Sequence, residues 1–185
     1  LCDQHGILLV ADEVQTGAGR TGTWLACERW WAEAGVAPDV ITMAKSLAGG
    51  FPLSAIIGRA EVMDAAAPGG LGGTYAGSPI ACAAALGVIQ AFEQDGLLAR
   101  SNAVGERLTA GLRQIAARHP GIGDVRGLGA MVAIELFKDG DLTRPDPERT
   151  RAVVAEAAKR GLILLFCGVY ANVIRVLVPL TASDA

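Results

Sequence analysis

Two short apolar runs, each ending at one charged residue, constrain the fold of this chain more than any other feature. Residues 7–11, ILLVA, lead into Asp12, and residues 38–44, PDVITMA, lead into Lys45. A continuous apolar run of this length is typical of a strand that is buried on both faces, as in a parallel sheet. Ligands of open α/β sheets bind beyond the carboxyl ends of the strands, so the pattern predicts an acid and an amine at one site.

The rest of the chain alternates helices with strands, which indicates an α/β fold. Ser78 and Pro79 are typical of an N-cap and a first helical residue, so a long Ala-rich helix is expected to follow and to stop at Gly96. We expect a larger domain over residues 1–100 and a smaller α/β domain over residues 101–185. Further helices are predicted at 24–35, 97–119 and 149–160, and further strands at 54–58, 124–137, 162–166 and 172–179.

Composition and charge argue against several classes of protein. The net charge is −3 with both signs interspersed, so nucleic acid is not an expected partner. Glycine and polar residues interrupt every apolar run before it is long enough to cross a bilayer, so no membrane span is expected. The hydrophobic fraction of 51% exceeds the need of a small monomer and predicts a buried partner surface. The chain opens at Leu1, almost directly into a strand, and we expect it to be incomplete at both ends.

The cysteines and histidines favour a reducing compartment and predict no metal site. No two of the four cysteines form a Cys-x-x-Cys pair, which argues against structural zinc and against a disulfide framework. A cytoplasmic location is the simplest interpretation. His5 and His119 have no cysteine or carboxylate at ligand spacing, so both are expected to be ordinary surface residues.

Asp12 and Lys45 admit two interpretations on residue types alone. One is a buried ion pair within the sheet. The other is a site for pyridoxal phosphate, where a lysine forms the Schiff base and an aspartate partners the pyridinium nitrogen. The carboxylate keeps that nitrogen protonated, the cationic ring acts as an electron sink, and the displaced lysine can carry a proton. Both interpretations stay open at this level.

A glycine pattern nearby raises a third interpretation, an NAD(P)-binding module. Residues 17–22, GAGRTG, match G-x-G-x-x-G and follow a predicted strand. In a dinucleotide fold the first glycine turns directly off the strand, but here residues 12–16 intervene. That fold also requires an acid at the end of the second strand, where this chain has Lys45. These two departures argue against a dinucleotide site.

Five segments together closely resemble the class III aminotransferases. The resemblance covers nearly the whole chain, and it implies a fold type I transferase that depends on pyridoxal phosphate. The chain would then be the C-terminal part of a large, mainly parallel-sheet domain followed by a small C-terminal α/β domain. A homodimer or a dimer of dimers is also implied. The segments are LLVADEVQTGAGRTG, AKSLAGGFPLSAIIG, PGGLGGTYAGSPIACAAAL, GDVRGLGAMVAIEL and VIRVLVPLT.

The same resemblance implies roles for five residues around the cofactor. Lys45 binds the cofactor covalently and is the catalytic residue, and Asp12 pairs with the pyridine nitrogen. Val14 packs on one face of the ring, and Gln15 contacts the side of the ring that carries the hydroxyl. Thr74 binds the cofactor phosphate across a dimer interface, in the site of the other subunit. Without the resemblance, Thr74 is simply a loop hydroxyl.

The resemblance also implies that Arg175 recognises the carboxylate of 2-oxoglutarate or glutamate. A planar guanidinium can hold a carboxylate by two parallel hydrogen bonds. Taken by itself, an arginine inside an apolar strand predicts an internal salt bridge instead. Arg126 is interpreted as structural. Phe166 stands where family members that act on 4-aminobutyrate have a small polar residue, which leaves the amino donor open.

The activity implied is transfer of the ω-amino group of 4-aminobutyrate to 2-oxoglutarate, which gives succinate semialdehyde and glutamate. Other donors are 5-aminovalerate, ornithine and acetylornithine. The alternatives from other classes are an NAD(P)-binding module and an inactive fragment. The family's phosphate loop, its ring-stacking aromatic residue and its arginine for the donor's distal carboxylate would lie upstream of Leu1. We therefore expect residues 1–185 alone to be inactive.

Overall fold

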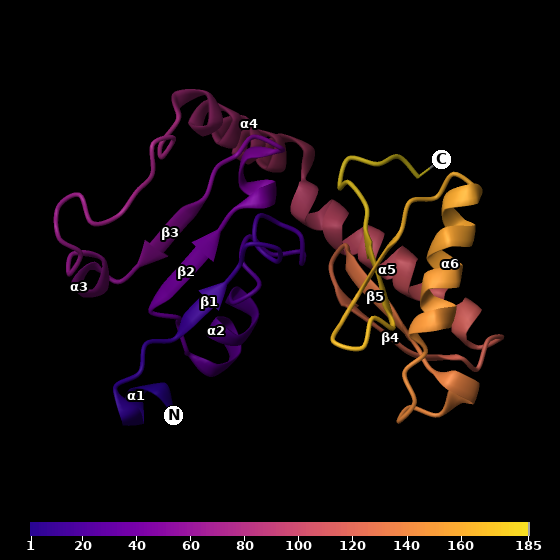
Figure 1. The fold of residues 1–185 in the computed structure, drawn as a ribbon. Coiled ribbons are helices and arrows are strands. Elements are labelled where there is room, and N and C mark those ends of the chain that lie inside the picture. Colours follow the sequence, from indigo (N-terminus) through magenta and orange to yellow (C-terminus); the bar gives the residue numbers. More distant parts are fainter. Residues whose placement is uncertain (185) are drawn as a thin grey trace. The chain divides into compact units, whose positions relative to one another are not determined.

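The first of two compact units carries a three-stranded mixed sheet. The computed structural model describes residues 1–184, and its units are Leu1–Leu98 and the chain from Ala99 onward. Strands β1 (Val10–Asp12), β2 (Val40–Met43) and β3 (Ala55–Gly58) pair in that order (Figure 1). β1 and β2 are parallel, with Asp12 opposite Thr42, whereas β3 is antiparallel to β2. The carboxyl ends of β1 and β2 therefore meet at one edge, as predicted.

The prediction that these strands are buried on both faces was wrong for β1 and β3, whereas β2 has only buried and half-buried residues. In β1 only Ala11 is buried, while Val10 is 54% exposed. In β3 both Ile56 and Ile57 are about half exposed. An apolar run shows that a strand can be buried, but burial needs a layer on each side. Within residues 1–184 no such second layer covers these side chains.

Helices and short turns connect the strands of this unit. The long helix predicted after Ser78 is confirmed as α4, which begins with Pro79 and ends at Gly96 in the left-handed conformation (φ 61°). A small core lies on one side of the sheet, where Ala11 and Ile41 meet the buried Cys27. The other helical elements are α1 (Cys2–His5), α2 (Glu28–Ala34), η1 (Lys45–Ala48) and α3 (Ala60–Met63), and α4 spans Pro79–Asp95.

Asp39 ties the three strands together at the edge opposite the predicted site. Its carboxylate accepts a hydrogen bond from the Leu9 amide (2.7 Å) and forms an ion pair with Arg59 (2.7 Å). Its main chain bonds to the same two residues. The amide of Leu9, and then the guanidinium of Arg59, hold the pKa of the Asp39 carboxyl below its ordinary value. One residue thus fixes the starts of β1 and β2 and the end of β3.

The second unit is a four-stranded antiparallel sheet with two helices. The strand order is β4-β5-β7-β6. Ile134 and Ile174 form its core, and Leu112 from α5 and Val154 from α6 pack against that core. Both helices therefore pack on the sheet face that carries these side chains. The elements are α5 (Leu97–Ala116), β4 (Ile122–Leu128), β5 (Met131–Leu136), η2 (Lys138–Gly140), α6 (Pro147–Lys159), β6 (Leu165–Cys167) and β7 (Val173–Leu177).

The single strand predicted over 124–137 was wrong, because the chain folds there into the β4–β5 hairpin. Gly129 makes the turn with φ 50°, a conformation that glycine adopts without strain. The turn packs tightly on α5. Ser101 accepts a hydrogen bond from the Ala130 amide (3.2 Å), and a Cβ placed on Gly105 would lie 1.8 Å from the Gly129 carbonyl oxygen. None of the helices within residues 1–184 has the length and apolarity of a membrane span.

Candidate active site

Asp12 is the last residue of β1, and residues 1–184 donate hydrogen bonds to only one of its two carboxylate oxygens. Oδ1 accepts hydrogen bonds from the Val14 amide (3.0 Å) and from the Thr42 hydroxyl (3.2 Å). The side chain is exposed, and no donor from residues 1–184 contacts Oδ2. The structure thus presents a fixed carboxylate with one oxygen available to a donor from a ligand.

Lys45 lies at the same edge and has an unusual backbone. It follows β2 after one residue and begins η1, and its φ is 48°. A residue other than glycine in this region costs about 1–3 kcal/mol and persists only where the surroundings fix it. Here Leu47 packs on the core and Ala48 is fully buried, so the turn is anchored just beyond the lysine. Such strained positions cluster at functional sites.

The alternative of a buried ion pair between Asp12 and Lys45 is wrong. Both side chains are exposed, and no salt bridge joins them in the described part of the chain. The amine that seemed from the sequence to lie in an interior segment instead faces solvent, just past the end of its strand. The Asp12 carboxylate and the Lys45 amine therefore lie at one edge of the sheet without forming an ion pair with each other.

Glu13, next to Asp12, has a structural role that sequence analysis did not assign. It is only 2% exposed, and its carboxylate accepts hydrogen bonds from the Cys27 amide (2.7 Å) and the Thr16 hydroxyl. These bonds fasten the glycine-rich loop beneath Asp12. Burial, and then the hydrogen bond with Glu13, raise the pKa of the Cys27 thiol to about 11. Strand alternation was the available signal, because it puts Glu13 on the face opposite to Asp12.

Close packing explains why glycine stands at residues 17 and 19 of the glycine-rich loop. A Cβ on Gly17 would lie 2.8 Å from the Glu13 carbonyl oxygen, and one on Gly19 would lie 2.0 Å from the Phe92 ring. Gly19 also has φ 78°. The next helix does not begin until Glu28, so no helix N-terminus follows this loop directly. The structure accounts for the glycines without a dinucleotide.

Val14 and Gln15 follow Asp12 in the same turn, and Thr74 lies elsewhere in this unit. Val14 is half-buried, and Gln15 is exposed and has an interaction within the chain. Thr74 is exposed in the loop before α4. The structure brings Asp12, Val14, Gln15 and Lys45 to one edge of the sheet and does not bring Thr74 among them.

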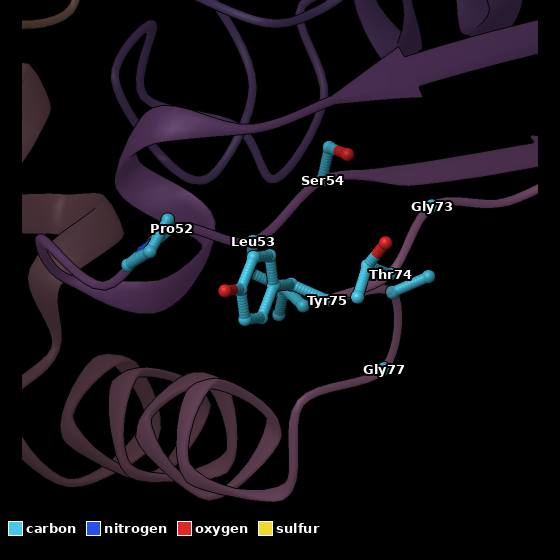
Figure 2. A pocket seen from close by; sticks show the side chains of 8 residues that line it. Pro52, Leu53, Ser54, Gly73, Thr74, Tyr75 and Gly77 are labelled. Atoms are coloured by element: carbon cyan, nitrogen blue, oxygen red, sulfur yellow. The ribbon is translucent and has the colours of Figure 1, made fainter.

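Thr74 lines an open pocket of about 520 Å³. The pocket lies between residues 52–54, which precede β3, and residues 73–77, which precede α4. Figure 2 shows the Ser54 and Thr74 side chains on these two segments. No charged side chain lines the pocket, and neither Asp12 nor Lys45 borders it. Its polar groups are hydroxyls and main-chain groups.

In the second unit, Arg175 occupies β7, where Ala133 and Leu165 are its cross-strand neighbours. Its side chain is half-buried and has an interaction within the chain. Side chains directly opposite each other in a sheet share one face, so Arg175, Ala133 and Leu165 point to the same side. Phe166 pairs with Ile174 and belongs to the other face, the one that α5 and α6 cover. The register thus separates Phe166 from Arg175.

Arg126 shares the face of Arg175 two strands away, beyond Ala133 of β5, and its surroundings fit the structural role predicted for it. It forms ion pairs with Asp124 and with Glu135 (2.6 Å). These two carboxylates, Asp124 first, raise the pKa of the Arg126 guanidinium. Glu135 also accepts a hydrogen bond from the buried amide of Asn172 (3.2 Å). Both carboxylates that pair with Arg126 therefore belong to its own sheet.

The donor set of the first unit fits pyridoxal phosphate. Asp12 offers an acceptor for a ring N–H, and Lys45 offers an amine that pairs with no carboxylate of residues 1–184. The hydroxyls near Thr74 offer neutral donors for a phosphate. Residues 1–184 contain no cluster of side chains that could hold a metal ion.

Comparison with known proteins agrees with this chemistry. The sequence profile of the family described as "Aminotransferase class-III" matches residues 1–185. The chain is 67% identical to the 5-aminovalerate aminotransferase DavT of Pseudomonas putida and 64% identical to the 4-aminobutyrate aminotransferase GabT of Escherichia coli. Both alignments cover all 185 residues, and the chain spans 42% of the length of each relative.

Solved structures give the same fold. A Bacillus anthracis aminotransferase matches with a TM-score of 0.86 and 34% identity, over 99% of this chain and 42% of that one. An amine transaminase from an uncultivated Pseudomonas species, in its PLP-bound form, matches with a TM-score of 0.83 and 36% identity, over 98% of this chain and 42% of that one.

Proposed function

The chain belongs to the class-III aminotransferases, a family that depends on pyridoxal phosphate, and from this premise we propose that the whole protein transfers the ω-amino group of 4-aminobutyrate to 2-oxoglutarate. The observation that carries the proposal is the 64% identity to the Escherichia coli 4-aminobutyrate enzyme over the full length of this chain. The exposed carboxylate and amine at one sheet edge support it.

A second amino donor, 5-aminovalerate, is favoured by the 67% identity to the Pseudomonas putida enzyme. The two donors differ by one methylene, and a hydrophobic pocket discriminates such a difference by only about 1–3 kcal/mol. Both are therefore kept as candidates, with the reaction type unchanged.

The proposed roles at the sheet edge follow from the donor set. Asp12 accepts the ring N–H of the cofactor through Oδ2, while Oδ1 stays bonded to the chain. The amine of Lys45 would hold the cofactor covalently and, when free, would carry the proton from the amino-bearing carbon of the donor to the cofactor. Val14 packs on the ring, and Gln15 contacts the side that carries the ring hydroxyl. Pyridoxal phosphate held by these residues would supply an electron sink for the amino-bearing carbon of the donor.

Thr74 is proposed to bind the cofactor phosphate in the site of a partner subunit. Its exposure, and its pocket apart from Asp12 and Lys45, support a role outside its own site. This proposal requires a homodimer or a larger assembly of such pairs.

Arg175 is proposed to hold the carboxylate of 2-oxoglutarate or glutamate, with the uncharged Ala133 and Leu165 beside it. A reducing cytoplasm remains the proposed compartment, since all four cysteines are free.

A donor screen on the whole protein tests the reaction and its substrate together. Each of 4-aminobutyrate, 5-aminovalerate, ornithine and acetylornithine is supplied with 2-oxoglutarate, and glutamate formation gives kcat/KM. We expect glutamate from the first two donors, and none from the Lys45→Ala variant. The donor with the higher kcat/KM identifies the substrate. Absence of glutamate with every donor would refute the proposed activity.

A further inference from the structure

We propose that Thr42 is a positioning residue for Asp12, an inference that rests on the proposed function. Thr42 lies directly opposite Asp12 in the parallel β1–β2 ladder. Its hydroxyl donates to Oδ1 of Asp12 at 3.2 Å, and the Val14 amide donates to the same oxygen at 3.0 Å. Two donors on one oxygen fix how the carboxylate is turned and leave Oδ2 for the ring nitrogen.

The hydroxyl of Thr42 is a better candidate for this role than any main-chain group. An exposed aspartate at a strand end can rotate, and a rotated carboxylate presents its free oxygen in the wrong direction. The amide of Val14 is only two residues along the chain, so it moves together with Asp12. Thr42 belongs to the neighbouring strand, and it therefore ties the carboxylate to the rigid part of the sheet.

The sheet itself does not depend on this hydroxyl. The Thr42 carbonyl accepts a hydrogen bond from the Glu13 amide (2.9 Å), and the main chain of Thr42 pairs with both β1 and β3. Valine has the same shape and a similar preference for strands. The Thr42→Val substitution therefore removes the donor and keeps the ladder, which separates positioning from folding.

The expected effect is on the cofactor first. A single hydrogen bond of this kind changes an equilibrium by about 2- to 10-fold. We expect Thr42→Val to raise the Kd of the whole protein for pyridoxal phosphate by that factor, and to lower kcat by a similar factor with little change in the KM of either substrate. Titration of the cofactor-free protein, followed by visible absorbance, gives the Kd.

Two further variants make the test specific. Thr42→Ser keeps the hydroxyl and should restore a Kd close to that of the unmodified protein. Thr23→Val is the matched control, because it removes a hydroxyl in the same unit that is bonded to the Leu25 carbonyl (2.7 Å) and not to Asp12. It should leave the Kd unchanged. If Thr42→Val proves unstable, Thr42→Ala against Thr42→Ser gives the same comparison, since that pair also differs by the hydroxyl.

The Asp12→Asn variant distinguishes failure of this inference from failure of the proposed function. If Asp12→Asn weakens cofactor binding and slows turnover while Thr42→Val matches the unmodified protein, Thr42 has no positioning role and the proposed function stands. If Asp12→Asn itself has no effect, the role of Asp12 is wrong and this inference falls with it. In the double variant, Thr42→Val should add nothing to Asp12→Asn. Additive losses would show that Thr42 acts independently and would overturn the inference.

Discussion

Alanine at Gly105 should destabilise the second unit, whereas alanine at Gly111 of the same helix should stabilise it. Both glycines lie inside α5. Replacement of a glycine in a helix interior by alanine normally gains about 1 kcal/mol. A Cβ on Gly111 meets nothing within 4 Å, so the gain should be realised there. At Gly105 the same atom would lie 1.8 Å from the Gly129 carbonyl oxygen.

The magnitude at Gly105 follows from what must move. Both atoms in the clash belong to rigid segments, so the β4–β5 turn must retreat from α5. Its retreat breaks the hydrogen bond from the Ala130 amide to Ser101, which contributes about 1 kcal/mol, and disturbs packing at a cost of about 1–3 kcal/mol. After subtraction of the helix gain, Gly105→Ala should lower the free energy of unfolding by about 1–3 kcal/mol.

Hydrogen exchange in the whole protein is a suitable assay, because it resolves single segments. Amides of residues 122–136 should exchange faster in Gly105→Ala and at an unchanged or slower rate in Gly111→Ala, while residues 7–58 serve as an internal reference. Thermal unfolding should give midpoints shifted in opposite directions. Equal protection of 122–136 in the two variants would refute the reasoning, since it would mean that α5 and the turn can separate at no cost.

Five further outcomes are expected in the whole protein. Borohydride should trap the cofactor on Lys45 and on no other lysine. Lys45→Gly should unfold at a higher temperature than Lys45→Ala, because a positive φ costs alanine about 1 kcal/mol. Mixed Thr74→Ala and Lys45→Ala chains should regain activity in heterodimers, where one site receives both intact residues; no recovery would place Thr74 in its own chain's site. Because the pKa of Asp39 is lowered on folding, its ionised carboxylate stabilises the fold fully above its ordinary pKa of 3.8, and this stabilisation is lost as the pH falls further. Asp39→Asn should therefore flatten the acid limb of a plot of unfolding free energy against pH. The raised pKa of Cys27, about 11, implies that at pH 8 a thiol reagent should label the exposed Cys82 quickly and Cys27 only after unfolding; equal rates would contradict the buried thiol.

The position of the candidate site was predictable because it depends on local patterns. Two apolar runs ended at Asp12 and at Lys45, and parallel strands place such ends together. The exposure of both side chains was not predictable, since an apolar run does not show how many layers cover a sheet. The backbone of Lys45 was equally inaccessible, because nothing in the letters of residues 40–50 requires a positive φ at a lysine.

Register explains the other differences between prediction and structure. The contact of Thr42 with Asp12 depends on which residues stand opposite each other, and one sequence does not specify that pairing. The β4–β5 hairpin was missed because residues 124–137 contain no Asn-Gly or Asp-Gly pair to mark the turn that Gly129 makes. The concern raised by Phe166 also depended on register, since only the pairing with Ile174 shows that it lies on the face away from Arg175.

The separation of Arg175 and Phe166 onto two faces of the sheet has a practical meaning for anyone who wishes to re-engineer the protein. Mutational libraries at Ala133 and Leu165 would vary the immediate surroundings of Arg175 while leaving the hydrophobic layer under α5 and α6 intact. Libraries at Ile134 and Ile174 would mainly select for folded protein. The two sets of positions alternate along the same strands. A library of adjacent positions therefore changes both the surroundings of Arg175 and the hydrophobic core, whereas a library of every second position changes only one of them.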